Sequence, residues 1–533
     1  MQNKENKNIV LTGFMGTGKT TVGKLLADRL NREFIDTDDL IQERQGMAIS
    51  EIFSTHGEAA FRKMEAEIAR ELGEKDGLVI STGGRLMLDP GNVAALTRNG
   101  RVFCLIATPQ ELVSRIQKDT EHRRPLLEVP DPQKQVVELL QERQKGYNRF
   151  QKVITDDKQP DEVTDYLLDT FQEDPKRFSI DHPAQPYDFV VGSGILPFIR
   201  QLARTEGQMV VITDACVHDL YAQSCGDVNG FISIPAGSKH KTLATVQNVY
   251  DRLIEMGFDR SGTLIALGGS VVGDVAGFVA ATYMRGVNFI QCPTSLLSMV
   301  DTSIGGKTSI DLPKGKNFIG AFKAPSMVIA DVALLQTLPA GDFIAGMAEV
   351  VKHGLIADSN LLEKVENGHW QHHDTGILHT SLFDIQALVA QAIQVKISIV
   401  QQDPFDHGKR FALNLGHTFA HAIEQVSEYS IRHGEAVAMG LVAAANLSTR
   451  LQYCPASLQI KIETLLAKIG LPTRIPPMPV EMLLKTMEND KKRKGDSNSF
   501  VLFDQMGKTF IAHDVDRDHI QATLSELTTD KPA

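Results

Sequence analysis

Short apolar runs alternate with stretches of helical periodicity in the first third of the chain. Apolar runs occur at residues 9–11, 79–80 and 102–106, and helix-like spacing extends over 20–30. Short buried strands separated by amphipathic helices are typical of a parallel sheet covered by helices on both faces. We therefore expect an α/β domain at residues 1–171.

A second series of apolar runs follows a polar segment at residues 172–186. That segment has three prolines among charged residues, which predicts a linker. Strand-like runs then recur at intervals and predict a second α/β domain at residues 187–337. From there the pattern changes to long helical periodicity, as at 387–400, so residues 338–533 are predicted to be mostly helical.

Composition limits the classes of function. The chain has 533 residues and a formal charge of 55 − 66 = −11, which argues against a general nucleic-acid binder. Its five cysteines are scattered and form no C-x-x-C pair, which indicates a reducing, cytoplasmic compartment. We find no apolar run near 18 residues and expect no membrane span.

A phosphate-binding motif follows the first apolar run. Residues 13–20 read GFMGTGKT and fit G-x-x-x-x-G-K-[ST] between a predicted strand and a predicted helix. Backbone amides of such a loop, together with the helix N-terminus, bind nucleotide phosphates. The predicted ATP-binding residues are Gly13, Gly16, Thr17, Gly18, Lys19 and Thr20, and the Thr20 hydroxyl is expected to hold Mg²⁺.

Two carboxylates end the next predicted strand. Of this pair, Asp36 and Asp38, one could serve Mg²⁺ and the other could take a proton from a substrate hydroxyl. Three arginines, Arg62, Arg124 and Arg143, could converge on an anionic substrate, because guanidinium groups match carboxylate and phosphate.

These motifs resemble shikimate kinase over roughly residues 7–165. The resemblance also rests on Thr82-Gly83-Gly84 and on the segment that follows Arg124. It implies that Thr20 and Asp36 serve Mg²⁺, that Asp38 is catalytic, and that Arg124 reaches the transferring phosphate. The implied shikimate-binding residues are Asp38, Arg62, Gly83, Gly84 and Arg143. The family usually has a third glycine where this chain has Arg85, and another small polyol or hydroxy acid is the alternative substrate.

Four potential metal ligands occur in the last third of the chain: Glu349, His417, His421 and His433. A carboxylate and two imidazoles with an open position describe a catalytic zinc site. Spacing alone favours His417 and His421, which share a helix face. A glycine turn at 268–269 follows a predicted strand and suits a pyrophosphate, although it does not match G-x-G-x-x-G.

Together with basic residues among glycines, these motifs resemble 3-dehydroquinate synthase over roughly residues 187–510. The supporting stretches include 268–274, 299–307, 410–421 and 433–435. The resemblance implies zinc, or cobalt, at Glu349, His417 and His433, with His421 as a substrate or proton-relay residue. The implied NAD-binding residues are Asp214, Lys241, Gly269, Asp274, Thr294, Asp301, Lys307, Lys316 and Thr337.

The same resemblance implies a substrate, 3-deoxy-D-arabino-heptulosonate 7-phosphate, that is converted to 3-dehydroquinate and phosphate with NAD cycling between its oxidised and reduced forms. The implied catalytic residues are Lys307, Lys352, Arg410, Asn414 and His421. The substrate would also contact Arg285, Lys316 and Asn317, and Arg285 would come from the neighbouring subunit of a homodimer. Ser238 and Ser270 depart from the family pattern near the nucleotide. Related cyclases that act on other sugar phosphates are the alternative.

The resemblances predict a fold of three parts: a P-loop kinase-like domain, an α/β NAD-binding domain and a helical metal-binding domain. The predicted function is that of a bifunctional enzyme on the route to chorismate, with shikimate kinase and 3-dehydroquinate synthase activities. The two steps are not consecutive, so the fusion hands over no product directly. The alternative is an active synthase with a non-catalytic, nucleotide-binding regulatory module.

Overall fold

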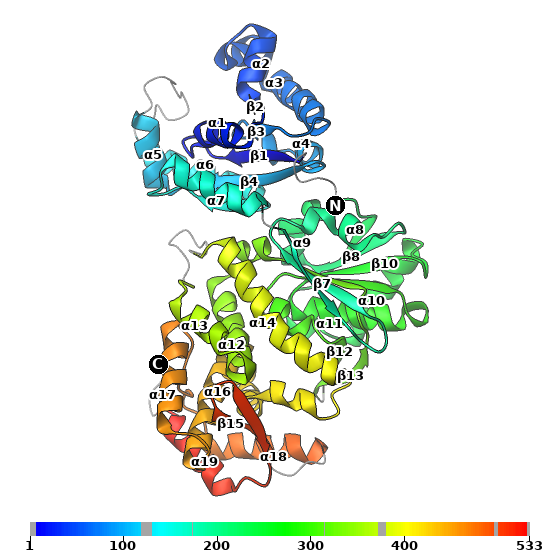
Figure 1. Cartoon of the computed structure of the whole chain (residues 1–533). Coiled ribbons are helices and arrows are strands. Elements are labelled where there is room, and N and C mark those ends of the chain that lie inside the picture. The colour runs from blue at the N-terminus through cyan, green and yellow to red at the C-terminus, as the bar shows by residue number, and fades with distance from the viewer. Residues whose placement is uncertain are drawn as a thin grey trace.

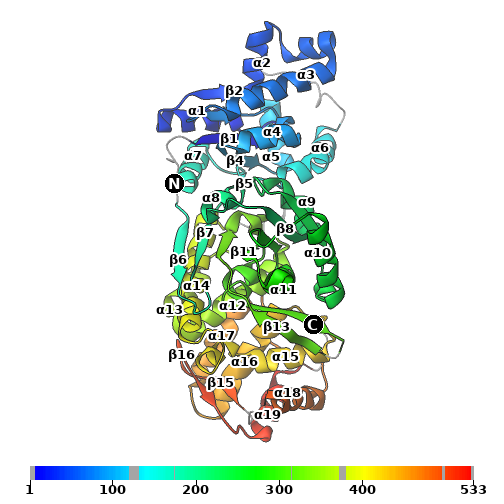
Figure 2. The ribbon, with the colours of Figure 1, turned by 90° about the vertical axis from the view of Figure 1, so that its right-hand side faces the viewer.

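The computed structural model describes residues 7–118, 131–172, 174–313, 315–370, 380–494 and 499–529. The chain forms two parts. The first sheet and its helices lie at the top of Figure 1, in blue and cyan, and the remainder lies below in green to red. A view from the side shows the same two parts in contact (Figure 2).

The first part is built on a five-stranded sheet in the order β2-β3-β1-β4-β5, and all of its pairings are parallel. Neighbouring residues of β1 enter different hydrophobic clusters, because Val10 packs on one face and Ile9 and Leu11 on the other. Both faces are therefore covered, as predicted. The strands are β1 (Asn8–Gly13), β2 (Phe34–Asp36), β3 (Val79–Ser81), β4 (Gly100–Ile106) and β5 (Gln151–Ile154).

Helices connect the strands of this part and cover its sheet. They are α1 (Lys19–Leu30), α2 (Thr37–Gln45), α3 (Ile49–Gly73), α4 (Pro90–Thr97), α5 (Pro109–Lys118), α6 (Pro132–Tyr147) and α7 (Pro160–Gln172). Helices α1 and α2 begin where β1 and β2 end, so both start at the carboxyl edge of the sheet. Ligands bind at this edge in open α/β sheets.

The segment predicted as a linker contains a strand instead. Within 172–186, β6 (Lys176–Ile180) pairs antiparallel with β7 (Tyr187–Gly192) and forms the edge of the second sheet. Prolines and charges suggested an irregular segment. An edge strand tolerates both, because one side of it needs no ladder partner.

The second sheet has seven strands in the order β6-β7-β14-β11-β10-β8-β9. Apart from the β6–β7 pair, its strand pairings are parallel. Its further strands are β8 (Met209–Asp214), β9 (Gly230–Ile234), β10 (Thr263–Gly268), β11 (Asn288–Pro293) and β14 (Met327–Asp331). Its helices include α8 (Ile199–Ala203), α9 (Ala215–Tyr221), α10 (Leu243–Glu255) and α11 (Ser270–Thr282), and a hairpin of β12 (Lys307–Leu312) and β13 (Gly315–Phe322) extends from it.

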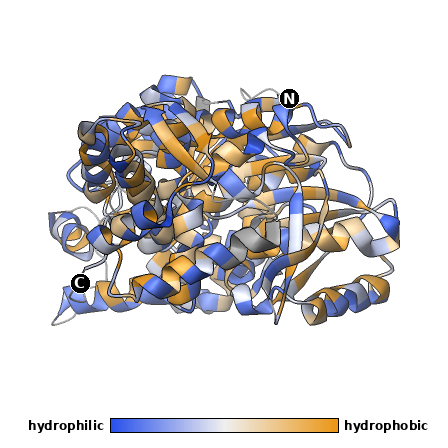
Figure 3. Cartoon of the chain, turned by 90° about the horizontal axis from the view of Figure 1, so that it is seen from below, coloured by the Kyte–Doolittle hydropathy of each residue, from blue (hydrophilic) through white to orange (hydrophobic). Residues whose placement is uncertain are grey.

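The C-terminal third is mostly helical, as predicted, but it also contains a hairpin that the periodicity did not reveal, of β15 (Phe500–Gln505) and β16 (Lys508–Ala512). Its helices are α12 (Ala340–Ala357), α13 (Ser359–Asn367), α14 (Leu382–Gln402), α15 (His417–Val426), α16 (His433–Arg450), α17 (Ala456–Lys468), α18 (Val480–Lys494) and α19 (Arg517–Leu527). One hydrophobic cluster runs from Phe189 of the sheet to Leu527 of α19, so the helices share a core with the sheet. Hydrophobic and hydrophilic positions alternate along the outer helices (Figure 3).

Helix α14 corrects one detail of the sequence interpretation. It is long and apolar enough to cross a membrane by length and composition, whereas we found no such run in the sequence. In the folded chain, residues such as Leu388 and Ile393 are fully buried in the shared core. A core helix of a globular domain passes the same test, so α14 is weak evidence for a membrane.

Candidate active sites

The loop between β1 and α1 has the conformation of a phosphate-binding loop. Gly16 and Gly18 have φ values of 81° and 90°, a region that side chains rarely enter. The Lys19 ammonium donates to the carbonyl oxygens of Gly13 and Phe14, each at 2.9 Å, so it lies over the loop. The Thr17 hydroxyl closes the turn by donating to the Phe14 carbonyl at 2.8 Å. The N-cap residue of α1 is Gly18, which has no side chain to cap the helix, and an uncapped N-terminus suits an anionic ligand.

The predicted Mg²⁺ ligands lie together. The Thr20 hydroxyl donates to Asp36 Oδ2 at 3.0 Å, and the other Asp36 oxygen accepts from the Asp38 amide at 3.1 Å. Asp36 thereby caps α2 and is fixed beside the phosphate-binding loop.

Asp38 lies in a crowded and negatively charged corner. Burial, and then the nearby Asp36 and Glu65 carboxylates, raise its pKa to about 6. A Cβ atom at position 83 would lie 2.4 Å from Asp38 Oδ1, so any larger residue there would displace the Asp38 carboxylate. The geometry therefore gives a reason for glycine at position 83, which sequence comparison alone expressed only as a resemblance.

The arginines predicted to bind substrate approach the same corner from α3 and α6. Arg62 is bound by Glu58 at 2.9 Å and by the buried Glu65 at 2.7 Å. Arg143 is 4% exposed, lies over the Phe14 ring, and its Nε atom has no hydrogen-bond partner. A buried guanidinium atom without a partner is costly and suits an anionic ligand. Arg124 lies outside the described residues.

Arg85, where the family pattern has glycine, points to two carboxylates. Its guanidinium lies 3.8 Å from Glu58 and 3.8 Å from Glu142, and its side chain is 45% exposed. Glu58 belongs to α3 and Glu142 to α6, so Arg85 bridges the two helices that carry Arg62 and Arg143.

The second sheet brings three of the nine predicted nucleotide residues to one edge. Asp214, Gly269 and Thr294 follow the carboxyl ends of β8, β10 and β11, which are neighbours in the sheet. Gly269 is the N-cap residue of α11 and has no side chain to cap the helix. Such an edge, with an uncapped helix N-terminus, is where dinucleotides bind in open α/β sheets.

A polar cluster lies beside this edge. The Lys241 ammonium lies 2.6 Å from Asp274 Oδ2 and 2.5 Å from the Asn317 side-chain oxygen. Burial raises the pKa of Asp274, although Lys241 opposes the shift. Residues predicted for the nucleotide and for the substrate therefore meet here. Thr337, another predicted nucleotide residue, shares a short hydrogen bond with Tyr221.

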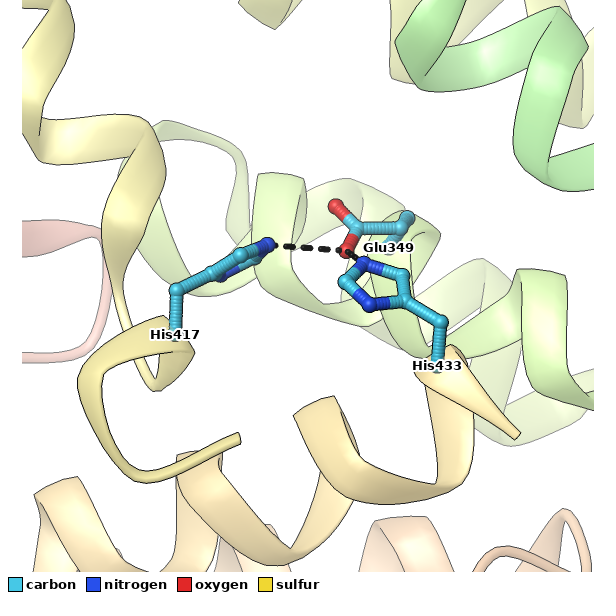
Figure 4. Close-up of side chains that lie close together, drawn as sticks. All are labelled: Glu349, His417 and His433. Atoms are coloured by element: carbon cyan, nitrogen blue, oxygen red, sulfur yellow. Dashed lines mark ion pairs between the residues drawn. The ribbon is translucent and has the colours of Figure 1, made fainter. Parts of the chain in front are cut away.

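The three predicted metal ligands converge from three helices. Glu349 is on α12, and His417 and His433 are the first residues of α15 and α16; their side chains point toward one another (Figure 4). His417 Nε2 lies 3.5 Å and His433 Nε2 lies 3.7 Å from Glu349 Oε1. One ligand atom from each residue lies within 4.8 Å of the other two. His421, which spacing alone favoured, lies next to this triad, with its ring centroid 5.5 Å from that of His417.

The electrostatics of the triad differ between the two histidines. Burial lowers the pKa of His417 to about 3. For His433 burial acts in the same direction, but contacts with Glu349 and Glu424 outweigh it and raise its pKa to about 10. His417 Nδ1 lies 3.1 Å from the Leu415 carbonyl, and His433 Nδ1 lies 3.2 Å from Glu424. These contacts hold both Nε2 atoms toward the centre of the triad.

A buried charge network continues from Glu349 into the core. Glu349 contacts Lys352, and the Asp301 carboxylate lies 3.9 Å from Lys352 and 2.6 Å from Lys396. Burial, together with nearby cations, lowers the pKa of Lys396 to about 8 despite its contact with Asp301. Burial opposes the charge of Asp301, but Lys396 and Lys352 lower its pKa below the ordinary range.

Sequence reasoning missed two members of this network. Lys396 is a buried residue of the apolar helix α14. A single lysine among apolar residues was the signal in the sequence that could have indicated a buried charge. His353 is fully buried with neither ring nitrogen hydrogen-bonded, and it forms a second potential metal group with Asp301 and Glu349.

The remaining predicted substrate residues differ in burial. Arg410 is 5% exposed and donates to the carbonyl of Pro404 at 3.2 Å, and Asn414 ends the same short helix. Lys307 pairs with Asp406 at 2.6 Å, and Lys316 lies over the Tyr429 ring. Arg285 occupies an exposed turn with φ 66°.

Comparisons with known proteins relate each part of the chain to a protein family. Two family models, described as the N-terminal and C-terminal domains of 3-dehydroquinate synthase, match residues 231–345 and 346–493. The chain is 43% identical over 293 residues to 3-dehydroquinate synthase of Rippkaea orientalis, covering 55% of this chain and 79% of that protein. It is 42% identical to the enzyme of Pelobacter propionicus, covering 59% of this chain and 89% of that protein. The chain belongs to the 3-dehydroquinate synthase family.

The N-terminal part belongs to a second family. The shikimate kinase family model matches residues 15–172, so the chain is a fusion of a shikimate kinase part and a synthase part. A solved 2-deoxy-scyllo-inosose synthase, complexed with carbaglucose-6-phosphate, NAD⁺ and Co²⁺, is 26% identical with a TM-score of 0.58. That match covers 66% of this chain and all of the other. The polar groups that the sequence analysis assigned to each activity lie in the corresponding part of the chain.

Proposed function

We propose that both parts are catalytic. The kinase part transfers phosphate from ATP to shikimate, and the synthase part converts 3-deoxy-D-arabino-heptulosonate 7-phosphate to 3-dehydroquinate and phosphate. The observation that carries this proposal is the assembly of two separate sets of reactive groups in one chain. One set surrounds the phosphate-binding loop at Lys19, and the other surrounds Glu349. Each set lies in the part that matches the corresponding family.

In the kinase part, each polar group has a role that fits its position. Thr20 and Asp36 would hold Mg²⁺ with ATP, which when bound offsets the charge of the phosphates. Lys19 turns toward the phosphates from its place over the loop. Asp38, with its raised pKa, takes the proton of the attacking hydroxyl. Arg62 and Arg143 bind the carboxylate of shikimate.

The donor set of the synthase part fits a divalent metal. The Glu349 carboxylate is fully buried, with Oε2 against the Lys352 ammonium and with two imidazole nitrogens facing Oε1. A carboxylate and two imidazoles are ligands of zinc and also suit cobalt. The bound metal would polarise a substrate oxygen. Glu424 orients His433 toward it from behind.

The carboxyl edge of the second sheet fits NAD. The uncapped N-terminus of α11 beside Gly269 offers amides to a pyrophosphate, and the Lys241–Asp274 pair provides polar contacts nearby. Bound NAD would supply reversible hydride transfer. No glutamate stands near Ser238 in the sequence at the family's position, so adenosine would be held by fewer contacts.

The network beside the metal triad binds and protonates the substrate. Arg410 and the lysines 307, 352 and 396 supply positive charge for the carboxylate and phosphate of the heptulosonate. Lys396, with a pKa of about 8, is suited to gain or lose a proton near neutral pH. His421 and Asn414 contact the sugar hydroxyls beside the metal, and His421 relays a proton.

We further propose that the protein acts in the cytoplasm as a homodimer, with Arg285 completing the partner's site. The exposed position of Arg285 supports this role. The five cysteines are free, which suits a reducing compartment. Small molecules are the only ligands we propose.

The synthase reaction is tested by phosphate release from the heptulosonate phosphate with NAD present. We expect activity to be lost after treatment with a metal chelator and to return when Zn²⁺ or Co²⁺ is added. Glu349→Gln should lower metal content and activity together, while Glu363→Gln, a change at an exposed residue of α13, serves as a control. Full activity in a metal-free sample would contradict the metal role.

A further inference from the structure

The kinase part and the synthase part meet through a pair of hydrogen bonds at a sheet edge. Strand β5 is the outer strand of the first sheet. Its Lys152 amide donates to Gln336 Oε1 at 2.8 Å, and Gln336 Nε2 donates to the Lys152 carbonyl at 2.8 Å. Gln336 belongs to the short helix at Val332–Thr337, which follows β14 in the synthase sheet. The side-chain amide thus satisfies the same two groups that a neighbouring strand would satisfy.

The residues around this pair are polar and buried. Gln336 is 7% exposed and Gln151 is 5% exposed. The Gln151 side-chain oxygen accepts from Arg101 of the kinase part at 3.0 Å and from Ser193 of the synthase part at 3.1 Å. Arg101 also donates to the Thr170 carbonyl at 2.6 Å. Buried polar groups that are paired across a contact specify one arrangement, because any slip leaves them unpaired.

Further contacts flank the centre on both sides. The Lys7 ammonium lies 3.4 Å from the centre of the Phe198 ring, and the Gln386 side chain donates at 3.4 Å to the carbonyl of Asp174 in the connection between α7 and β6. Burial raises the pKa of the Tyr166 hydroxyl in α7, and the backbone of Leu382 in α14 lowers it through a hydrogen bond. Helix α7 faces the synthase part in both views (Figures 1 and 2). The contact therefore extends well beyond a single pair.

The connection between the two parts is also short. Helix α7 ends at Gln172, and β6 begins at Lys176 as the edge of the synthase sheet. A tether of this length leaves little freedom for one part to swing away from the other.

We propose that the kinase part is docked on the synthase part in one fixed orientation, and that Gln336 anchors it by closing the open edge of the kinase sheet at Lys152. The synthase part thereby serves as the partner that covers β5, since an uncovered edge strand invites pairing with other chains. This docking is a property separate from the two catalytic activities and does not depend on them. Joining the two parts in one chain therefore covers the edge of the kinase sheet, in addition to ensuring that both parts are expressed together.

The direct test is hydrogen exchange of the full chain, resolved to single amides by mass spectrometry with fragmentation. We expect the Lys152 amide to be protected in the unmodified chain and to exchange roughly ten times faster in Gln336→Ala. Gln336→Glu keeps an acceptor for this amide but loses the donor to the Lys152 carbonyl, so its protection should lie between the two. Gln401→Ala, a change at an exposed glutamine of α14, should leave the Lys152 amide unchanged.

Small-angle X-ray scattering of the same samples gives a second readout. One rigid arrangement should reproduce the profile of the unmodified chain, and Gln336→Ala should require a wider distribution of sizes. Exchange of the Lys152 amide at the rate of an exposed peptide in the unmodified chain would overturn the proposal, even if a variant failed to fold. Unchanged protection in a folded Gln336→Ala chain would overturn the anchoring role of Gln336.

Discussion

At the scale of single residues, Asp38 illustrates how position sets chemistry. An ordinary aspartate has a pKa of 3.8 and is a weak base, whereas burial and the carboxylates of Asp36 and Glu65 raise the pKa of Asp38 to about 6. A stronger base takes a proton from a hydroxyl more readily. Because the pKa is higher in the folded chain than in the unfolded chain, ionising Asp38 costs stability as the pH rises from 3.8 toward 6.

This shift predicts the pH dependence of the kinase. As the proposed base, Asp38 must be ionised to accept a proton, so we expect the turnover rate to fall below a pH of about 6, by about tenfold per pH unit. Steady-state ADP formation over a pH series measures it. Asp38→Asn should lower the rate by about 100-fold or more and remove this acidic limb. A rate that stays constant from about pH 5 to 7 in the unmodified chain would contradict the role of Asp38.

For Arg85, in contrast to Asp38, we predict only a small effect on activity, because its guanidinium is exposed. It lies 3.8 Å from Glu58 and from Glu142 on the surface, and exposed ion pairs contribute about 0–1 kcal/mol. Restoring the family residue with Arg85→Gly should therefore change the KM for shikimate by less than about fivefold. Arg62→Ala should raise the same constant by more than about tenfold. A large effect of Arg85→Gly would place its guanidinium on the substrate.

At the scale of elements, the metal triad depends on the crossing of α12 and α16. These helices carry Glu349 and His433, and they touch at Gly434. A Cβ atom there would lie 1.8 Å from the Ala345 carbonyl oxygen, so the helices approach as closely as glycine permits. The distance between the ligands is thus set by a residue that is not itself a ligand.

Gly434→Ala should separate the two helices. We expect about 1–3 kcal/mol of lost stability and weaker metal binding, measured by thermal unfolding and by competition with a chelator. Gly273→Ala in α11 is a matched control, since its Cβ would meet only Gln291 at 3.6 Å and alanine favours helix. Equal stability and equal metal affinity of Gly434→Ala and the unmodified chain would contradict this account of the crossing.

The sequence predicted elements better than it predicted contacts between them. The phosphate-binding loop and the parallel strands follow local periodicity and local motifs, and both are found where expected. The β6 strand was missed because its residues 176–180 are mainly polar or charged and gain their pairing only from β7. The spacing of His417 and His421 described one helix correctly. The choice of His433 as the third ligand depends on where α16 begins relative to α12, which no local pattern contains.

Buried charges and the docking contact were also beyond local reasoning. Lys396 pairs with Asp301, which lies 95 residues earlier in the chain, and Gln336 pairs with Lys152 across 184 residues. In the sequence, each of these residues is an ordinary polar side chain. Its partner becomes known only from the fold, which brings distant segments together.

At the scale of the whole molecule, two sites of different chemistry share one chain. The kinase site lies at the carboxyl edge of a five-stranded sheet, and the synthase site lies between a seven-stranded sheet and a set of helices. The groups that serve each site come from its own part. The two activities should therefore be separable by single substitutions, even though the parts are in contact.

The most direct test measures both activities in the same purified full chain and in two variants. We predict shikimate-dependent ADP formation with MgATP and phosphate release from the heptulosonate phosphate in the unmodified chain. Lys19→Ala should abolish the first and retain the second, and Glu349→Gln should do the reverse. A folded chain that releases phosphate from the heptulosonate but forms no shikimate-dependent ADP would contradict the claim that the kinase part is catalytic.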